Sequence, residues 1–450
     1  MDEIQSMRQA WGRYLPAFIK HKIEGGHHLQ GVISNSAWFM GDRVIRMGVG
    51  LLVGVWLARY LGPSLYGEFN YAFAFAMMFA PVAMLGLDDI GIRELIKDPS
   101  NRDEILGTIF SLMLLGGLAV FLLATAIIFL VRPDDTLTHW LVAIMTVGTI
   151  FQAFIAIEFW FESQLQWKYT VFSKHTAFLI ISAIKIVLIL VKAPLVAFAW
   201  AGLAEIILGS AGLVLVYQAN GYRLKTWHYS RTIAGTLLKD SWPQIFSVFL
   251  TMVYLKIDQV MLGTMAGNEE LGFYSAAVRL TEAWYFIPLA ICSSVFPAIV
   301  AARATNEELF YERMQRLYNL MALISYGIAI PVMLFSGWIV DLLFHSAYTK
   351  TGPLLAVLIW TGLFTSLGAA RNVFMVSQNW LRINLATTLL GCLMNIALNY
   401  YLIPVYGAMG AIIASLISYW FAVHGTCFLF KPLRNTGWML TKAMIYPKIW

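Results

Sequence analysis

Three charged residues, Asp42, Arg43 and Arg46, lie in the stretch from Asn35 to Tyr71, inside what is otherwise typical of a membrane-spanning helix. An ionisable group in the hydrocarbon of a bilayer costs about 2.5–3.5 kcal/mol on insertion scales, so it usually faces a bundle interior or a water-filled cavity. Arg43 and Arg46 are three residues apart and share a helical face. Two cations against one acid suit a wall that binds an anion, whereas the structural alternative is an ion pair between Asp42 and Arg46.

Further ionisable residues in apolar segments extend this candidate site. At about 1.5 Å of rise per residue, Arg43 and Arg46 lie in the inner half of their helix and the other cations in outer halves, so cations are expected at two levels. The predicted holders of an anionic group are Arg43, Arg46, Lys185, Lys256 and Arg279. The acids predicted to serve in coupling or gating are Asp42, Glu158, Glu162, Glu205, Asp258 and Glu282.

The sequence leaves the roles of two sets of acids open. Glu158 and Glu162, one helical turn apart, are expected to cap a cavity, to pair with Lys168, or to carry protons. Glu205 has no local partner, so it is either a protonatable group or the partner of Lys185.

The composition identifies an integral membrane protein. The chain has 450 residues, of which 59% are hydrophobic and only 12% charged, and its mean hydropathy is +0.70. Soluble domains carry about 25% charged residues. Uncharged runs such as 105–131, 136–157 and 317–340 match the ~20 residues that cross a bilayer as a helix. Counting also the apolar segments that carry isolated charges, we predict an all-α protein of twelve transmembrane helices, two of them in the run 383–430.

The 31 Lys and Arg residues are distributed unequally between the two sides of the predicted membrane. Most of them lie in the termini and in the loops on the same side, so the positive-inside rule predicts that both termini are cytoplasmic. The net charge of +6 therefore reports topology and attraction to anionic lipids, and no nucleic-acid partner is expected. The cations expected on the outer side are Arg59, Arg132, Lys192 and Lys350.

A short glycine-containing motif occurs twice. Gly62 and Gly67 in LGPSLYGEF correspond to Gly267 and Gly272 in AGNEELGFYSAA. The repeat predicts two six-helix halves in the same orientation, a common plan for transporters. The expected organisation is an amino-terminal segment, 1–33, which is an interfacial helix or a disordered basic tail, then a first lobe at 34–218, a linker at 219–240, a second lobe at 241–430 and a basic cytoplasmic tail at 431–450.

The sequence holds no pattern typical of an enzyme or a metal centre. Its eight histidines occur without HExxH spacing, and it contains neither GxSxG nor a phosphate-binding loop motif. The three cysteines, Cys292, Cys392 and Cys427, show no pairing or metal spacing. We therefore predict that the chain is not an enzyme and needs no cofactor or metal.

Longer motifs carry a family resemblance. The segments LARYLGPSLYGEFNYAFAF, GLDDIGIREL and NIALNYYLIPVYGAMGAIIAS, together with FP near Pro297, resemble the polysaccharide transporter family over about residues 35–430. These are the Wzx-type flippases of O-antigen, capsule and exopolysaccharide synthesis, in the MOP superfamily that also holds MATE exporters and lipid II flippases. The resemblance implies two six-helix lobes in a V around a central cavity.

The resemblance also implies what the protein carries and where. The expected cargo is an undecaprenyl-diphosphate-linked oligosaccharide, moved by alternating access from the inner to the outer leaflet of the bacterial inner membrane. Cationic cavity residues would hold its diphosphate, because a guanidinium can replace lost water with charge-assisted hydrogen bonds. The other implied partners are membrane lipids, H+ or Na+ as a coupling ion, and polysaccharide polymerase or chain-length proteins.

Three alternatives come from related or similar proteins. Lipid II flippases usually carry two further helices at the carboxyl end, whereas a short basic tail is expected here. A MATE-like exporter of small cations would need an acidic cavity, whereas the cavity predicted here is basic. A membrane O-antigen polymerase or ligase generally holds a large outer loop, and the longest one here, around residues 345–351, is short.

Overall fold

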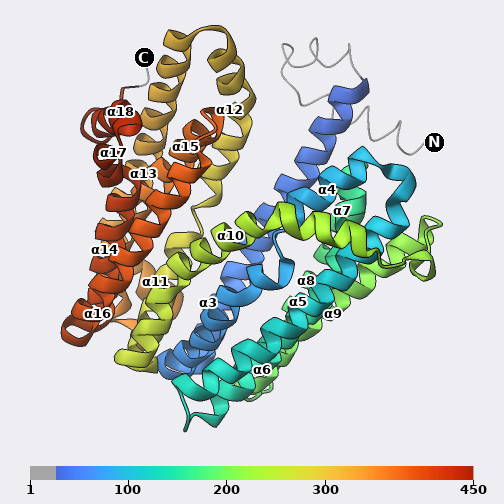
Figure 1. Cartoon of the computed structure of the whole chain (residues 1–450). Helices are drawn as coiled ribbons and strands as arrows, with labels where there is room; N and C mark the ends of the chain where they lie inside the picture. Colours follow the sequence, from blue (N-terminus) through green and yellow to red (C-terminus); the bar gives the residue numbers. More distant parts are fainter. Residues whose placement is uncertain (1–26, 449–450) are drawn as a thin grey trace, which may run out of the picture.

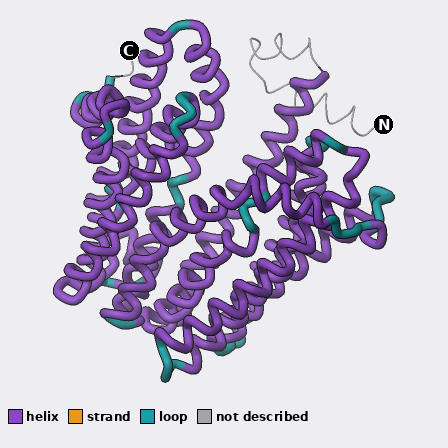
Figure 2. The backbone as a smooth tube through the Cα atoms, viewed as in Figure 1, coloured by secondary structure: helices purple, strands orange, loops and turns teal. Residues whose placement is uncertain are grey.

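The computed structural model describes the backbone of residues 27–448 and the side chains of residues 45–448. Every regular element in this part of the chain is helical, and Figure 2 shows the helices joined by short loops. Ten stretches of the described chain are long and apolar enough to cross a bilayer. The chain is therefore an all-α multi-pass membrane protein, as its composition predicts.

The first lobe is built from seven α-helices. The longest, α3, is broken at Gly62, whose φ of 69° and ψ of 171° are not helical, so the chain reverses there before Pro63. The helices are α3 (His27–Met84), α4 (Asp88–Lys97), α5 (Arg102–Val131), α6 (Thr136–Phe151), α7 (Ala156–Ser163), α8 (Trp167–Leu190) and α9 (Leu195–Ala219).

The second lobe is built from nine α-helices. Its longest, α16, is broken at Gly407, with φ of 55° and ψ of −131°. The helices are α10 (Arg231–Met265), α11 (Asn268–Glu282), α12 (Phe286–Thr305), α13 (Glu307–Phe344), α14 (Thr351–Leu358), α15 (Thr361–Ser377), α16 (Leu381–Trp420), α17 (Thr426–Leu429) and α18 (Arg434–Ile445). Because α3 and α16 each contain a break, the ten apolar stretches hold more than ten segments, and the exact count of twelve stays a prediction.

The helices form a V, as the family resemblance implies. In Figure 1 the two lobes converge at the end where α3 and α16 reverse, and they diverge toward the end where α3 begins and α18 lies. We call these the narrow end and the wide end. α3 packs against α10 and α11, so these helices form the seam between the lobes.

Apolar packing explains why the lobes meet at the narrow end. One buried cluster contains residues of both lobes, with Val55, Tyr71 and Ala124 from the first lobe and Tyr274 and Tyr348 from the second. A second cluster lies within the second lobe. A third packs Ala234 and Leu237, near the start of α10, against helices of the first lobe. The lobes therefore share an apolar core where they converge, and the start of α10 adds a second apolar contact with the first lobe.

The two copies of the glycine motif meet at this seam. Gly62 and Gly267 adopt the same unusual backbone conformation, with φ of 69° and 92° and ψ of 171° and 170°. A Cβ added to Gly67 would lie 1.7 Å from the carbonyl oxygen of Asn268, and one added to Gly272 would lie 1.9 Å from that of Pro63. Since these contacts are reciprocal, the structure agrees with the predicted repeat.

The structure adds detail to the predicted termini and linker. The expected linker at 219–240 ends within α10, which begins at Arg231. Most of the expected tail forms α18, where the carbonyl of Met439 accepts a hydrogen bond from Gln315 at 3.1 Å and that of Met444 from Tyr326 at 2.6 Å. Residues 1–26, which include most of the possible interfacial helix, lie outside the described residues.

One basic residue near a helix end is buried. Arg371 lies in α15 and is only 4% exposed. Its guanidinium donates to the carbonyl of Ala422 at 2.6 Å and to the hydroxyl of Thr387 at 2.9 Å. A buried Arg is tolerated here because neighbouring helices supply oxygen acceptors.

Candidate functional site

The predicted site residues of the first lobe converge on one carboxylate. Lys185 of α8 places its Nζ 3.2 Å from Oε2 of Glu205 on α9, and Nη1 of Arg46 on α3 lies 4.0 Å from Oε1 of the same carboxylate. These three side chains are only 22–30% exposed. Arg46 and Lys185 thus share one carboxylate, and Lys185 lies within ion-pair distance of Glu205.

Arg46 is held by more than this ion pair. Its Nη2 donates to the carbonyl of Lys174 at 2.5 Å, and its Cζ lies 4.8 Å from the ring centre of Phe178. Both contacts come from α8, so α3 and α8 together orient the guanidinium. The structure thus brings Arg46 and Lys185 to one level, whereas the sequence placed them at two.

A second group of charges lies beside the first and is acidic. Glu158 on α7 pairs with Lys174 on α8, not with Lys168 as the sequence considered. Glu162 lies within electrostatic range of Glu158, Lys174 and Asp88. Because acids outnumber cations here, this group does not extend the anion-binding wall.

The remaining two members of the opening motif cannot be placed in the same way. Asp42 and Arg43 lie in the first half of α3, but their side chains are outside the described residues. Their predicted roles, including the ion pair between Asp42 and Arg46, stay predictions.

The predicted site residues of the second lobe are paired or buried. Lys256 on α10 lies 3.2 Å from Glu282 on α11, which lowers its capacity to hold a cargo. Asp258 is 4% exposed and accepts hydrogen bonds from the hydroxyls of Tyr274 and, at 3.2 Å, Ser415. A buried carboxylate with hydroxyl donors suits a structural or proton-linked role rather than anion binding.

Arg279 lies at the seam between the lobes. Its Nη2 donates to the carbonyl of Gly50 on α3, and its guanidinium fills the space beside Gly54. The side chain therefore crosses from α11 in the second lobe to α3 in the first. It is separate from the group around Glu205.

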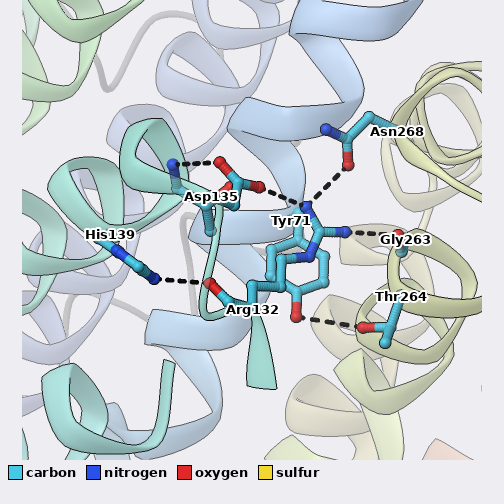
Figure 3. A network of polar contacts seen from close by, with 8 residues as sticks. Tyr71, Arg132, Asp135, His139, Gly263, Thr264 and Asn268 are labelled. Carbon is cyan, nitrogen blue, oxygen red and sulfur yellow. Dashed lines mark hydrogen bonds and ion pairs between the residues drawn. The ribbon is translucent and has the colours of Figure 1, made fainter. Parts of the chain in front are cut away.

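Sequence reasoning missed a polar network that joins the lobes at the narrow end (Figure 3). Arg132, which follows α5, donates to Asp135 at 3.0 Å within its own lobe. The same guanidinium donates to Asn268 at 3.0 Å and to the carbonyl of Gly263 across the seam, and it lies 3.6 Å from the ring centre of Tyr71. The sequence had marked Arg132 only as an outer-side cation.

A second arginine makes a similar bridge. Arg59 on α3 donates to the carbonyls of Leu342, at 2.6 Å, and Leu343 at the end of α13. Nearby, the hydroxyl of Tyr348 donates to the carbonyl of Ala58 at 2.8 Å. The acceptors are backbone carbonyls, so no charge pattern in the sequence could have identified these bridges.

Comparison with known proteins identifies the family. A family model for polysaccharide biosynthesis proteins matches residues 32–303, which is more than half of the chain. The chain belongs to this family. A MatE model also matches residues 243–401 of this polysaccharide biosynthesis protein.

Relatives of this polysaccharide biosynthesis protein are known from two organisms. A Shigella flexneri protein named as an O-antigen transporter is 24% identical over 404 residues, which cover 85% of this chain and 94% of the relative. The flippase AglR of Haloferax volcanii is 27% identical over 173 residues. That match covers 37% of this chain, and it spans only about a third of AglR, 36% of its length.

Solved structures establish the fold as that of the MOP superfamily. The lipid II flippase MurJ in an inward closed conformation gives a TM-score of 0.71 at 14% identity, with 90% of each chain covered. An inward-facing multidrug MATE transporter gives a TM-score of 0.66 at 17% identity, covering 87% of this chain and 96% of that one. These proteins are named as transporters or flippases and not as enzymes, in agreement with the sequence prediction.

Proposed function

We propose that this membrane protein is a flippase that moves an undecaprenyl-diphosphate-linked oligosaccharide from the inner to the outer leaflet of the bacterial inner membrane. The family, the two relatives and the MOP fold support a carrier of lipid-linked glycans. The observation that carries the proposal is the group around Glu205, where Arg46 and Lys185 share one carboxylate between transmembrane helices. Cations held between transmembrane helices suit an anionic cargo.

The chemistry of the diphosphate matches these side chains. A diphosphate that leaves water must have its hydration replaced by charged donors. The 4.0 Å separation between Arg46 and Glu205 is long for an ion pair, so a phosphate oxygen can compete with the carboxylate for the guanidinium. Lys185 would add a point charge beside this planar donor.

The predicted topology sets the direction of transport. If both termini are cytoplasmic, the wide end of the V faces the cytoplasm and the narrow end faces outward. This arrangement would admit cargo from the inner leaflet, and the seam at the narrow end must separate before the cargo leaves outward. Alternating access of this kind is widespread among transporters built from repeats.

Coupling residues stay a proposal within this scheme. Asp258 and Glu205 are the acids whose surroundings suit a change of charge, because each is enclosed by other helices. Glu158, Glu162 and Glu282 are the other candidates, and either H+ or Na+ would serve as the coupling ion. Polymerase or chain-length proteins would receive the delivered glycan.

The test is complementation of a strain that lacks its own flippase, with surface glycan and protein abundance both measured. Arg46→Ala should lower surface glycan by about tenfold or more, because the cargo loses a charge-assisted donor. Arg46→Lys should restore part of the activity, since an ammonium cannot reproduce the guanidinium fork. Arg316→Ala is a matched control, because Arg316 is 63% exposed and pairs only with Glu312 on its own helix in the described chain.

One double variant separates cargo binding from simple charge neutralisation. If Arg46 only neutralises Asp42, Asp42→Ala combined with Arg46→Ala should recover the function that Arg46→Ala loses. Recovery in that double variant, or normal surface glycan in Arg46→Ala at normal abundance, would reject Arg46 as a cargo residue. Absence of translocation by the wild-type protein with any undecaprenyl-diphosphate-linked glycan would reject the function itself.

A further inference from the structure

Arg279 occupies a space on α3 that exists only because residue 54 is glycine. A Cβ built on Gly54 would lie 1.9 Å from Cζ of Arg279 and 2.1 Å from its Nε and Nη2. Non-bonded carbon atoms approach to about 3.5–4.0 Å, so no side chain at position 54 is compatible with this placement. The guanidinium of the second lobe is thus packed directly onto the backbone of the first.

The hydrogen bond of Arg279 is made to the same face of α3 on which Gly54 lies. Its acceptor is the carbonyl of Gly50, one turn before Gly54 on the same face of α3. A helical carbonyl has two lone pairs and uses one within the helix, so the second can accept from the arginine. Together, Gly50 and Gly54 form what we call the glycine seat.

Only at Gly54 does Arg279 require the absence of a side chain. A Cβ added to Gly48 or to Gly50 would meet no atom within 4 Å. Glycine in a helix interior is about 1 kcal/mol less favourable than alanine. Among these three, therefore, only Gly54 has its missing side chain explained by a contact.

Arg279 is incompletely satisfied in the seat. Among the described residues no carboxylate lies within ion-pair distance of its guanidinium, and its buried Nε has no hydrogen-bond partner. A guanidinium offers five donors, and the backbone of α3 supplies one acceptor here. An oxyanion would satisfy the remaining donors better than the seat does.

We propose that the glycine seat holds Arg279 while the lobes are closed at the narrow end, and that separation of α11 from α3 releases the guanidinium to bind a phosphate group of the cargo. Arg279 then has two alternative partners, the backbone of α3 and the diphosphate. The inference rests on the proposed function for the identity of the cargo. It assigns an order, in which the group around Glu205 meets the cargo first and Arg279 meets it only after the seam has opened.

The seat can be tested by measuring the seam directly. Spin labels at Asp134→Cys in the first lobe and Tyr406→Cys in the second report the distance across the narrow end, and the three native cysteines are buried. Gly54→Ala should shift the distance distribution toward separated lobes by about tenfold in population, because the added methyl displaces Arg279. Gly48→Ala, on the same helix and with open space around it, should leave the distribution unchanged.

Binding of a phosphate group by Arg279 requires a separate experiment, in which inorganic pyrophosphate is the probe. In the wild-type protein, pyrophosphate should increase the separated population, because a ligand favours the state to which it binds more tightly. Arg279→Gln should show a separated population without ligand and no further increase with pyrophosphate. An equal response of Arg279→Gln and wild type would overturn the phosphate assignment.

The remaining outcomes also decide the question. A wild-type distance distribution in Gly54→Ala, with normal surface glycan at normal abundance, would overturn the seat. Loss of surface glycan in Gly54→Ala but not in Gly48→Ala, together with the shifted distribution, supports it. Since the distances are measured without translocation, a failure of the proposed cargo would leave the result on the seat interpretable.

Discussion

Glu205 holds the position in the first lobe on which charge balance depends. It faces Lys185 at 3.2 Å and Arg46 at 4.0 Å, so its neutralisation would leave two cations near each other without an acid between them. A phosphate that binds these two cations would compete with this carboxylate for them.

Glu205→Gln should therefore slow transport. The neutral amide leaves Arg46 and Lys185 without the negative charge that they share. Translocation rates measured in vesicles would show this at normal protein abundance. Glu312→Gln removes an exposed surface acid and serves as the control, and an unchanged rate in Glu205→Gln would remove this residue from the transport mechanism.

Asp135 provides a pH-dependent contribution to stability at the narrow end. Its burial raises the pKa, but hydrogen bonds from Thr138 and Arg132 outweigh that effect and hold the pKa of Asp135 below its ordinary value of 3.8. The folded state thus favours the ionised carboxylate. The stabilisation is fully present above the ordinary pKa and is lost as pH falls through the lower folded value.

Lowering the pH from 5 to 3 should therefore lower the melting temperature of the wild type more than that of Asp135→Asn. The difference should be about 1–3 °C, the range for a partly exposed ion pair in a protein of this size. Thermal unfolding in detergent at several pH values measures it. Asp134→Asn changes the exposed neighbouring acid and should behave as the wild type, and identical acid sensitivity of Asp135→Asn and wild type would contradict the assignment.

At the scale of elements, the paired glycine motifs decide how closely the second half of α3 and α11 approach. Gly272→Ala should destabilise the protein by about 1–3 kcal/mol, because its Cβ would lie 1.9 Å from the carbonyl oxygen of Pro63. Gly327→Ala on α13, where nothing lies within 4 Å, should be neutral or up to about 1 kcal/mol more stable. Melting temperatures of the two purified variants give the comparison, and equal stability would show that the seam relaxes without loss.

Elements were predictable from the sequence where local pattern decides them. Apolar runs identified the membrane helices, and the motif around Gly62 predicted both a reversal and its repeat at Gly267. Ion pairs between residues of different helices were harder to predict from the sequence. Lys174 pairs with Glu158 because the turn at Leu165, with φ of 56°, folds α8 back along α7, and residue spacing alone favoured Lys168.

Buried polar contacts to the backbone were not predictable for a related reason. Arg371 donates to the carbonyl of Ala422, and Arg132 donates to the carbonyl of Gly263. Every residue carries a carbonyl group, so no sequence pattern indicates which one lies nearby in the folded chain. From the sequence, a single Arg in a loop or at a helix end therefore indicates only the side of the membrane, and not a hydrogen bond to another helix.

At the scale of the whole molecule, the lobes are joined at the narrow end by a shared apolar core and by polar bridges. Arg132 and Arg59 of the first lobe each donate to backbone carbonyls of the second lobe. The two glycine motifs bring the backbones of α3 and α11 into close contact. Toward the wide end, α10 is linked to α4 by an ion pair between Arg93 and Asp240 at 2.6 Å and by a hydrogen bond from Gln244 to Asp89 at 3.3 Å, and its first turns pack against the apolar core of the first lobe. Separation of the lobes at the narrow end must therefore break the bridges made by Arg132 and Arg59.

The orientation of this V in the membrane gives the last prediction. The excess of Lys and Arg near the termini predicts that the wide end faces the cytoplasm. Ser64→Cys, exposed at the narrow end, should react with an impermeant maleimide added to cells with a permeable outer envelope and an intact inner membrane. Lys225→Cys, exposed in the chain between α9 and α10, should react only after the inner membrane is opened.

The wild-type protein, whose three native cysteines are buried, measures the background labelling. Labelling of Lys225→Cys from outside would show that the V has the opposite orientation in the membrane. The structure would then accept cargo from the outer leaflet instead of the inner one.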